Sequence, residues 1–254
     1  LYQYYGDQRV LEENYPMMQG YVAFLNSRAH DDVLDFGRWG DWCPPWHVNS
    51  VDTPYQLVSQ WYYYHDTLLL SQIASVLGKS EDADIYQAQA ERIKTAFNHT
   101  FLHDTQYGGA PDRWYQRLIP RTATAEEWRE IDQHLAGQFA VRSQTGDVLA
   151  LFLDLVPDDK KEAVLQGLVN DIVVIHGTHV NTGIVGTRYI LDVLSDNGYA
   201  DLAFKLVTQT TYPSWGYMVK EGATTLWERW EYLTDVGMNS QNHIMLGSID
   251  AWFY

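Results

Sequence analysis

The chain has 254 residues, enough to bury a sizeable core in one large domain or two small ones. Its formal net charge of -16 argues against a nucleic-acid partner, whose phosphates need clustered Lys and Arg, and against an anionic membrane surface. We find no apolar run of about 18 residues that would predict a membrane-spanning helix.

The first predicted element is a helix over about residues 7–27, where apolar residues recur at three-to-four spacing. Asp7 suits its N-cap, and Pro16 is expected to kink or divide it. The following stretch, residues 31–52, is rich in Gly and Pro and has no period. We expect it to be irregular.

Two long helices are expected next. The first covers residues 54–77, with Thr53 as its cap and Pro54 at the first position, and Gly78 closes it. The second covers residues 80–101 and begins with a polar, acidic turn.

The second half of the chain is also predominantly helical in pattern. Residues 107–123 have no clear period and are expected to form an extended loop or insertion. Residues 171–175 form the only β-branched run, and strand-like alternation is nearly absent. Helices are expected at residues 126–135, 146–155, 158–171, 183–194, 197–208 and 239–252.

This pattern predicts an all-α fold of roughly nine helices, without βαβ alternation. Helices joined by tight turns lie antiparallel, so a series of helical hairpins is expected. Since no linker suits a domain boundary, residues 1–254 are predicted to form a single domain.

Four aromatic, glycine-containing loop segments could carry chemistry. They are FGRWGDWCPPW at 36–46, HVNTGIVGT at 179–187, YPSWGYM at 212–218, and GATTLWERWEY at 222–232 followed by MNSQNH at 238–243. In the last of these, Glu228 lies between Trp227 and the pair Arg229 and Trp230. Indoles bind flat apolar faces and a carboxylate can move protons, so a sugar site is one interpretation. The other is an amphipathic segment whose tryptophans fill a core and whose Glu228 pairs with Arg229.

Metal and thiol chemistry are weaker interpretations. His176 and His179 are three residues apart and His243 lies far downstream, so a two-histidine, one-carboxylate site is conceivable. Loop histidines more often make ordinary hydrogen bonds, and no metal or cofactor is predicted. The single cysteine, Cys43, excludes an internal disulfide and is expected to be a small buried apolar residue.

Several of these segments also resemble the motifs of a known protein family. The segments RVLEENYP (9–16), RWGDW (38–42), NTGIVGT (181–187), LSDNGYADLAFKL (194–206), YPSWGYMV (212–219), GATTLWERWEY (222–232) and MNSQNHIMLGSIDAWFY (238–254) follow one family's order and spacing. In these segments the chain resembles the catalytic domain of bacterial α-L-rhamnosidases of glycoside hydrolase family 78. Residues 110–134 show no family pattern.

The resemblance implies an (α/α)6 barrel and removal of terminal α-L-rhamnosyl groups with inversion. It assigns the general base to Glu228 and sugar contacts to Trp42 and His243. The chemistry and position of other residues add candidate substrate-binding residues, namely Asp41, Trp215, Trp227, Arg229 and Trp230.

The chain departs from the family at the general acid. Members carry it in an Asp-Glu-Arg-x-Gly-Trp segment upstream, and no such segment occurs here. We therefore expect a fragment of about two-thirds of the barrel, incomplete on its N-terminal side, with very low activity and a tendency to self-associate. In a divergent complete protein, Asp41 or Glu221 would be the candidate acid.

Two other functions stay open. One is a helical sugar-binding module without turnover. The other is an (α/α)-barrel enzyme acting on uronate-containing glycans, which the few cations near the motifs (Arg38, Arg188 and Arg229) disfavour. The compartment also stays open; the single cysteine and the lack of a signal-peptide pattern favour the cytoplasm.

Overall fold

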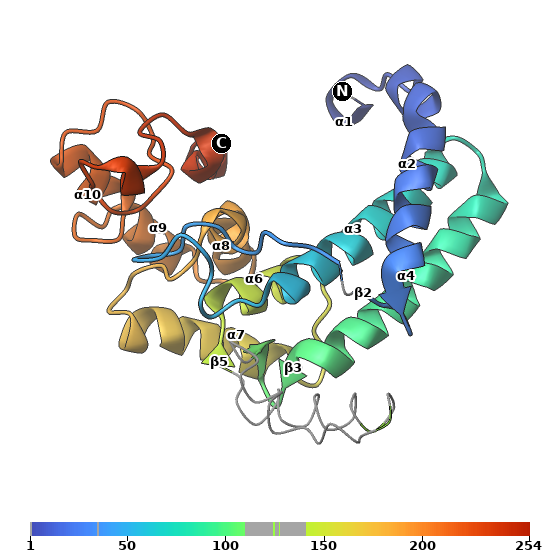
Figure 1. The fold of residues 1–254 in the computed structure, drawn as a ribbon, viewed down its shortest axis with the longest axis horizontal. Helices are drawn as coiled ribbons and strands as arrows, with labels where there is room; N and C mark the ends of the chain where they lie inside the picture. The colour runs from blue at the N-terminus through green and yellow to red at the C-terminus, as the bar shows by residue number, and fades with distance from the viewer. Residues whose placement is uncertain (1, 35, 110–123, 125–126, 128–140) are drawn as a thin grey trace. The chain divides into compact units, whose positions relative to one another are not determined.

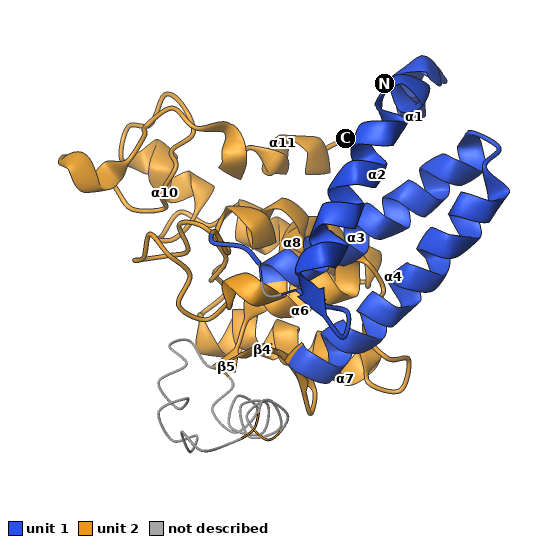
Figure 2. Ribbon diagram, turned by 45° about the vertical axis from the view of Figure 1, so that its right-hand side comes forward, with its two compact units in different colours: residues 1–38, 58–100 blue, residues 39–57, 101–254 orange. Residues whose placement is uncertain are grey.

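The computed structural model describes residues 2–34, 36–109, 124, 127 and 141–254 (Figure 1). Its contacts separate two compact units, residues 1–38 with 58–100 and residues 39–57 with 101–254 (Figure 2). The described parts of both units are mainly helical, as the sequence predicts. Among the described helices, none is both long and apolar enough to cross a membrane.

The first unit contains three long helices that lie side by side in both views (Figures 1 and 2). Its elements are α1 (Tyr2–Tyr5), α2 (Arg9–Arg28), the two-stranded sheet of β1 (Ala29–His30) and β2 (Val33–Leu34), α3 (Tyr55–Val76, which enters the unit at Val58) and α4 (Ser80–Phe101, to Thr100). Tyr15 and Val22 of α2 pack with Leu70 and Ala74 of α3 and with Ala83 of α4. These buried contacts join the three helices.

The connection between α3 and α4 confirms the predicted helical hairpin. Gly78 has φ +70°, a conformation that glycine adopts without strain, and the Lys79 N–H donates to the Ala74 carbonyl at 2.8 Å. The observed bounds of α3 differ from the prediction by one residue at each end, and those of α4 agree with it.

Pro16 does not divide the first helix, which was one of the two effects expected of it. Helix α2 runs through it, with Tyr15, Val22 and Leu25 on the buried face. Proline removes the N–H that would bond to the Glu12 carbonyl. Because Pro16 and Glu12 are both exposed, water can satisfy that carbonyl, and the helix continues.

In the second unit, α4 is followed by a small antiparallel sheet that the sequence did not predict. It consists of β3 (Leu102–His103), β4 (Gln106–Gly109) and β5 (Val141–Arg142), with β4 in the middle. The expected loop at 107–123 thus begins with a strand, and residues 110–123 lie outside the described residues. The helix expected at 126–135 also lies outside them, except for Glu127.

Helix α6 (Gln144–Phe152) is the most buried of the described elements of this unit. All its residues from Gln144 to Leu151 are buried, and it packs against β4 and two helices, α7 (Lys161–Asn170) and α8 (Ile184–Asp196). Asp147 of α6 ties it to the sheet, since it accepts a bond from the Tyr107 N–H at 2.7 Å and pairs with Arg142.

The remaining elements agree only partly with the predicted helices. They are η2 (Asp171–Ile175), α9 (Ala200–Val207), α10 (Trp215–Lys220), η3 (Val236–Met238), η4 (Ile244–Leu246) and α11 (Ser248–Trp252). The β-branched run is η2, a π-helical turn that continues α7. The helix predicted over 239–252 is wrong, because Asn239 has φ +63° and His243 is extended.

Candidate active site

The segment that carries Glu228 is neither helix nor strand, and main-chain bonds fix it. The Glu228 N–H donates to the Ser240 carbonyl at 2.9 Å, and the His243 N–H donates to the Leu226 carbonyl at 2.9 Å. The two parts of the last motif, WERW and MNSQNH, therefore lie side by side. The half-buried His243 caps η4, where its Nδ1 accepts a bond from the Met245 N–H at 3.4 Å.

The Glu228 side chain is half-buried, and only one of its two carboxylate oxygens is held by hydrogen bonds. Its Oε1 accepts a bond from the Trp42 indole N–H at 2.9 Å and a longer one from the Asn239 amide at 3.4 Å. Within the described part of the chain, its Oε2 accepts no hydrogen bond. One oxygen thus fixes the orientation of the carboxylate while the other can accept a proton from water.

Trp42 reaches Glu228 from a loop 186 residues away in sequence. The loop is closed by a bond from the Cys43 N–H to the Val48 carbonyl at 2.8 Å, and the Trp42 carbonyl accepts from the Ile184 N–H at 2.8 Å. The Trp39 ring packs edge-on against Trp42 at 5.1 Å. The structure therefore brings together two of the residues predicted for the site, Trp42 and Glu228.

Asp41, predicted as a substrate contact or an alternative acid, is enclosed by protein. It is 1% exposed, and Thr145 and the N–H groups of Gly183, Val185 and Gly186 all donate to its carboxylate. Burial raises the pKa of the Asp41 carboxyl, and these four donors oppose that shift. Asp41 therefore anchors its loop to the start of α8 and, contrary to the expectation, presents no surface to a ligand.

Gly183 is required for this anchoring. A Cβ at Gly183 would lie 2.3 Å from the Trp42 carbonyl oxygen and 2.7 Å from that of Asp41. The glycine in the segment NTGIVGT therefore allows the backbone of α8 to approach the loop that presents Trp42.

Three tryptophans that were expected to line the sugar-binding site are core residues instead. Trp215, Trp227 and Trp230 are 7%, 3% and 0% exposed. The indole N–H of Trp215 donates to the Leu246 carbonyl, that of Trp230 to the Thr182 carbonyl, and Trp227 stacks on Tyr232. For these rings the core interpretation is correct, because each is at most 7% exposed and the indole N–H groups of Trp215 and Trp230 are already bonded inside the protein.

Arg229 does not pair with Glu228. Its Nε lies 3.1 Å from the Glu231 Oε2, and its Nη1 donates to the Gly237 carbonyl at 2.8 Å. The Glu231 Oε1 accepts from the Tyr212 hydroxyl at 3.1 Å. Arg229 is buried in this network. It therefore stabilises the loop that carries Glu228 and is not available to bind a uronate.

Sequence reasoning missed Asn239, Glu231 and Tyr212 as individual residues. All three lie inside motifs that the sequence singled out, but no local pattern marks them. Asn tolerates the positive φ that Asn239 adopts, which is the one signal that could have pointed to it.

The thiol and histidine candidates take part in local contacts. Cys43 is 1% exposed and burial raises its pKa to about 12, which fits the small buried residue that the sequence predicts. The Nδ1 of His176 lies 3.0 Å from the Asp171 carboxylate, and His179 contacts the Thr211 hydroxyl at 2.8 Å. Among the described residues, no three His, Cys, Asp or Glu side chains converge as metal ligands do.

Comparison with known proteins gives a consistent result. Residues 1–254 match the family model of the bacterial alpha-L-rhamnosidase 6 hairpin glycosidase domain. The solved α-L-rhamnosidase of Dictyoglumus thermophilum is 47% identical with a TM-score of 0.85, and the match covers 100% of this chain and 26% of that one. The Streptomyces avermitilis α-L-rhamnosidase, solved in complex with L-rhamnose, is 30% identical with a TM-score of 0.78 and covers 100% and 22%.

A curated relative agrees with these structures. The α-L-rhamnosidase of Alteromonas sp. (strain LOR) is 31% identical over 266 residues, which cover 100% of this chain and 26% of the relative. The chain thus spans about a quarter of the length of the relatives that it matches. It has the predominantly helical fold of a six-hairpin glycosidase domain, and it belongs to the bacterial α-L-rhamnosidase six-hairpin glycosidase family.

Proposed function

We propose that the protein removes terminal α-L-rhamnosyl groups from glycosides by an inverting mechanism in which Glu228 is the general base. The relatives named above support the substrate class. The observation that carries the assignment of Glu228 is its asymmetric carboxylate, with Oε1 held by Trp42 and Oε2 open. In inverting glycosidases a carboxylate in this role activates a water on the face opposite the leaving group.

Neither of the two alternative acids, Asp41 and Glu221, is placed to donate a proton to the leaving oxygen. Asp41 is enclosed by four donors, so a glycosidic oxygen cannot reach its carboxyl. Glu221 is exposed to solvent where α10 ends. We therefore propose neither residue as the general acid.

The stereochemistry of the product tests this function. The naturally encoded protein, given an aryl α-L-rhamnoside, is expected to release β-L-rhamnose first, because a single displacement by water inverts the anomeric carbon. Proton NMR during the first minutes separates this anomer from the α anomer formed by mutarotation. Release of the α anomer first would reject Glu228 as a base for water in a single displacement, and absence of hydrolysis would reject the rhamnosidase assignment.

Trp42→Phe tests the contact that orients Glu228. The variant keeps an aromatic ring but loses the N–H bond to the carboxylate, a hydrogen bond to a charged group worth about 1.5–3 kcal/mol. We expect kcat/KM on the aryl rhamnoside to fall about 10- to 100-fold. Trp252→Phe is the matched control: it removes an indole N–H bond of 2.9 Å to Ser195 and should leave kcat/KM within about 2-fold.

A further inference from the structure

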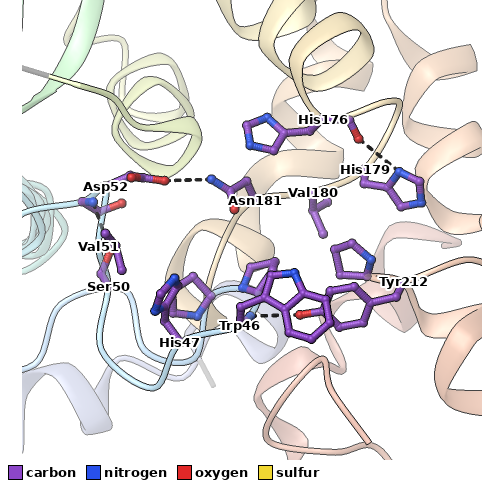
Figure 3. A pocket seen from close by; sticks show the side chains of 14 residues that line it. Trp46, His47, Ser50, Val51, Asp52, His176, His179, Val180, Asn181 and Tyr212 are labelled. Carbon is purple, nitrogen blue, oxygen red and sulfur yellow. Dashed lines mark hydrogen bonds between the residues drawn. The ribbon is translucent and has the colours of Figure 1, made fainter.

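The second unit contains a cavity that the Glu228 site does not explain. It measures about 310 Å³, within the range of small-molecule sites, and three loop segments line it: residues 44–53, 176–181 and 212–213 (Figure 3). None of the residues that the sequence predicted for the active site is among those lining it.

An aromatic pair, the exposed Trp46 and the half-buried Tyr212, forms part of this lining. Trp46 is 69% exposed, and its ring lies 4.2 Å from that of Tyr212. The main-chain N–H of Trp46 donates to the Tyr212 hydroxyl at 2.9 Å (Figure 3). Trp46 also has φ +67°, a conformation that costs a bulky residue about 1–2 kcal/mol. A large exposed ring held in a strained backbone favours a role in binding over a role in packing.

The polar part of the lining offers free hydrogen-bonding groups. The Asp52 Oδ2 accepts from the Asn181 amide at 2.8 Å (Figure 3). In the described residues, the Asp52 Oδ1 and the His47 imidazole make no hydrogen bond. These two groups could bind hydroxyls of a ligand.

The charges of the lining favour a neutral ligand. Among the described residues that line it there is no Lys or Arg, and the imidazole of His176 already pairs with Asp171. A phosphate or carboxylate would therefore meet Asp52 with no Lys or Arg to compensate its charge. An aromatic platform with free acceptors and donors fits a neutral, hydroxyl-bearing ring such as a sugar.

Three links tie this cavity to Glu228. Pro44 lines it and follows Trp42 by two residues, which span at most about 7 Å. Asn181 also lines the cavity. It lies two residues before Gly183, whose N–H donates to Asp41, the residue that precedes Trp42.

The third link runs through Tyr212, whose hydroxyl bonds to Glu231, three residues after Glu228. The cavity and the carboxylate are therefore parts of the same set of loops.

We propose that this cavity binds the sugar ring to which the rhamnosyl group is attached, that is, the leaving group of the reaction, with Trp46 as its platform. This inference rests on the proposed rhamnosidase function. It makes the cavity a determinant of which glycosides are cleaved, separate from the site that recognises rhamnose.

Two substrates that differ only in the leaving group test the proposal. In the naturally encoded protein, Trp46→Ala should lower kcat/KM about 10- to 100-fold on a rhamnosyl-glucose disaccharide. On methyl α-L-rhamnoside, which has no second ring, it should change kcat/KM by less than about 2-fold. Trp46→Phe keeps an aromatic platform and should restore most of the activity on the disaccharide.

Asp52→Asn is a second variant that should disturb folding less, because the carbonyl oxygen of the new amide can take the place of the Asp52 Oδ2 and still accept from Asn181. It replaces the free acceptor by a donor and should cause a selective loss of about 10-fold on the disaccharide. Equal losses on both substrates, or no loss on the disaccharide, would overturn the proposal while leaving the proposed function intact. If the unmodified protein cleaves neither substrate, the proposed function fails and this proposal with it.

Discussion

Glu228→Gln is expected to lower kcat on an aryl α-L-rhamnoside by about three to four powers of ten in the naturally encoded protein. The glutamine carbonyl can still accept the bonds from Trp42 and Asn239, so the side chain should keep its position. Its NH2 group replaces the open Oε2 and cannot take a proton from water. Since the ground-state contacts to the sugar are retained, KM should change by less than about 3-fold.

Glu221→Gln is the matched control for this experiment. Glu221 lies in the same stretch of chain but is exposed, and in the described residues its carboxylate makes no hydrogen bond. Its substitution should leave kcat within about 2-fold. A loss as large as that of Glu228→Gln would instead identify Glu221 as the missing acid.

Rhamnose binding and rhamnoside hydrolysis, measured together, separate an enzyme from a sugar-binding module. Calorimetry should show that Glu228→Gln binds L-rhamnose within about 3-fold of the unmodified protein. If the unmodified protein binds rhamnose but hydrolyses no rhamnoside, the module is the better interpretation. If Glu228→Gln hydrolyses at an unchanged rate, Glu228 is not the base.

The helices that the sequence predicted best are those with local signals at both ends. Helix α4 begins at Ser80 with acidic residues in its first turn, and α3 ends just before Gly78. Capping and positive φ depend on a few adjacent residues, so the sequence alone suffices to place such ends.

Periodicity failed where apolar residues pack on distant loops. Between Asn239 and Trp252 the spacing predicts one helix, but Leu246 is buried and its carbonyl accepts the Trp215 indole N–H. In the sheet of β3, β4 and β5, strand β5 was missed because it pairs with β4 across more than 30 positions, as between Gly108 and Arg142, while β3 and β4 pair locally over only a few residues.

Sequence neighbours of Glu228 proved a poor guide to its contacts. Trp227 and Trp230 flank it in the chain but are buried, whereas the ring that binds its carboxylate comes from Trp42. Which indole is buried depends on the tertiary packing of the loops. The sequence could predict an aromatic site around Glu228, but not which aromatic residues form it.

Asp41 shows most clearly why a motif residue need not contact the ligand. It precedes Trp42, so a motif-based reading places both at the sugar. The structure shows that the Asp41 carboxylate instead accepts bonds from three main-chain N–H groups at the start of α8. A negative charge is favourable there, because it complements the unpaired N–H groups and the positive end of the helix dipole.

We therefore expect Asp41→Asn to lower the free energy of unfolding by about 3 kcal/mol. The Asn Oδ1 can accept from Val185 and Gly186, but its NH2 must then face the Gly183 N–H, which lies 2.6 Å from the native oxygen. Two donors would oppose each other in a site closed to water. A urea titration should show a lower midpoint with an unchanged slope.

Asp159→Asn is the control for this loss of charge. Asp159 is exposed, and in the described residues its side chain makes no hydrogen bond, so the midpoint should shift by less than the equivalent of about 0.5 kcal/mol. Asp41→Asn should also reduce kcat, because the loop that it anchors presents Trp42 to Glu228. Full stability with lost activity would instead mean that Asp41 acts on the substrate. Full stability with full activity would mean that the loop is held without its charge.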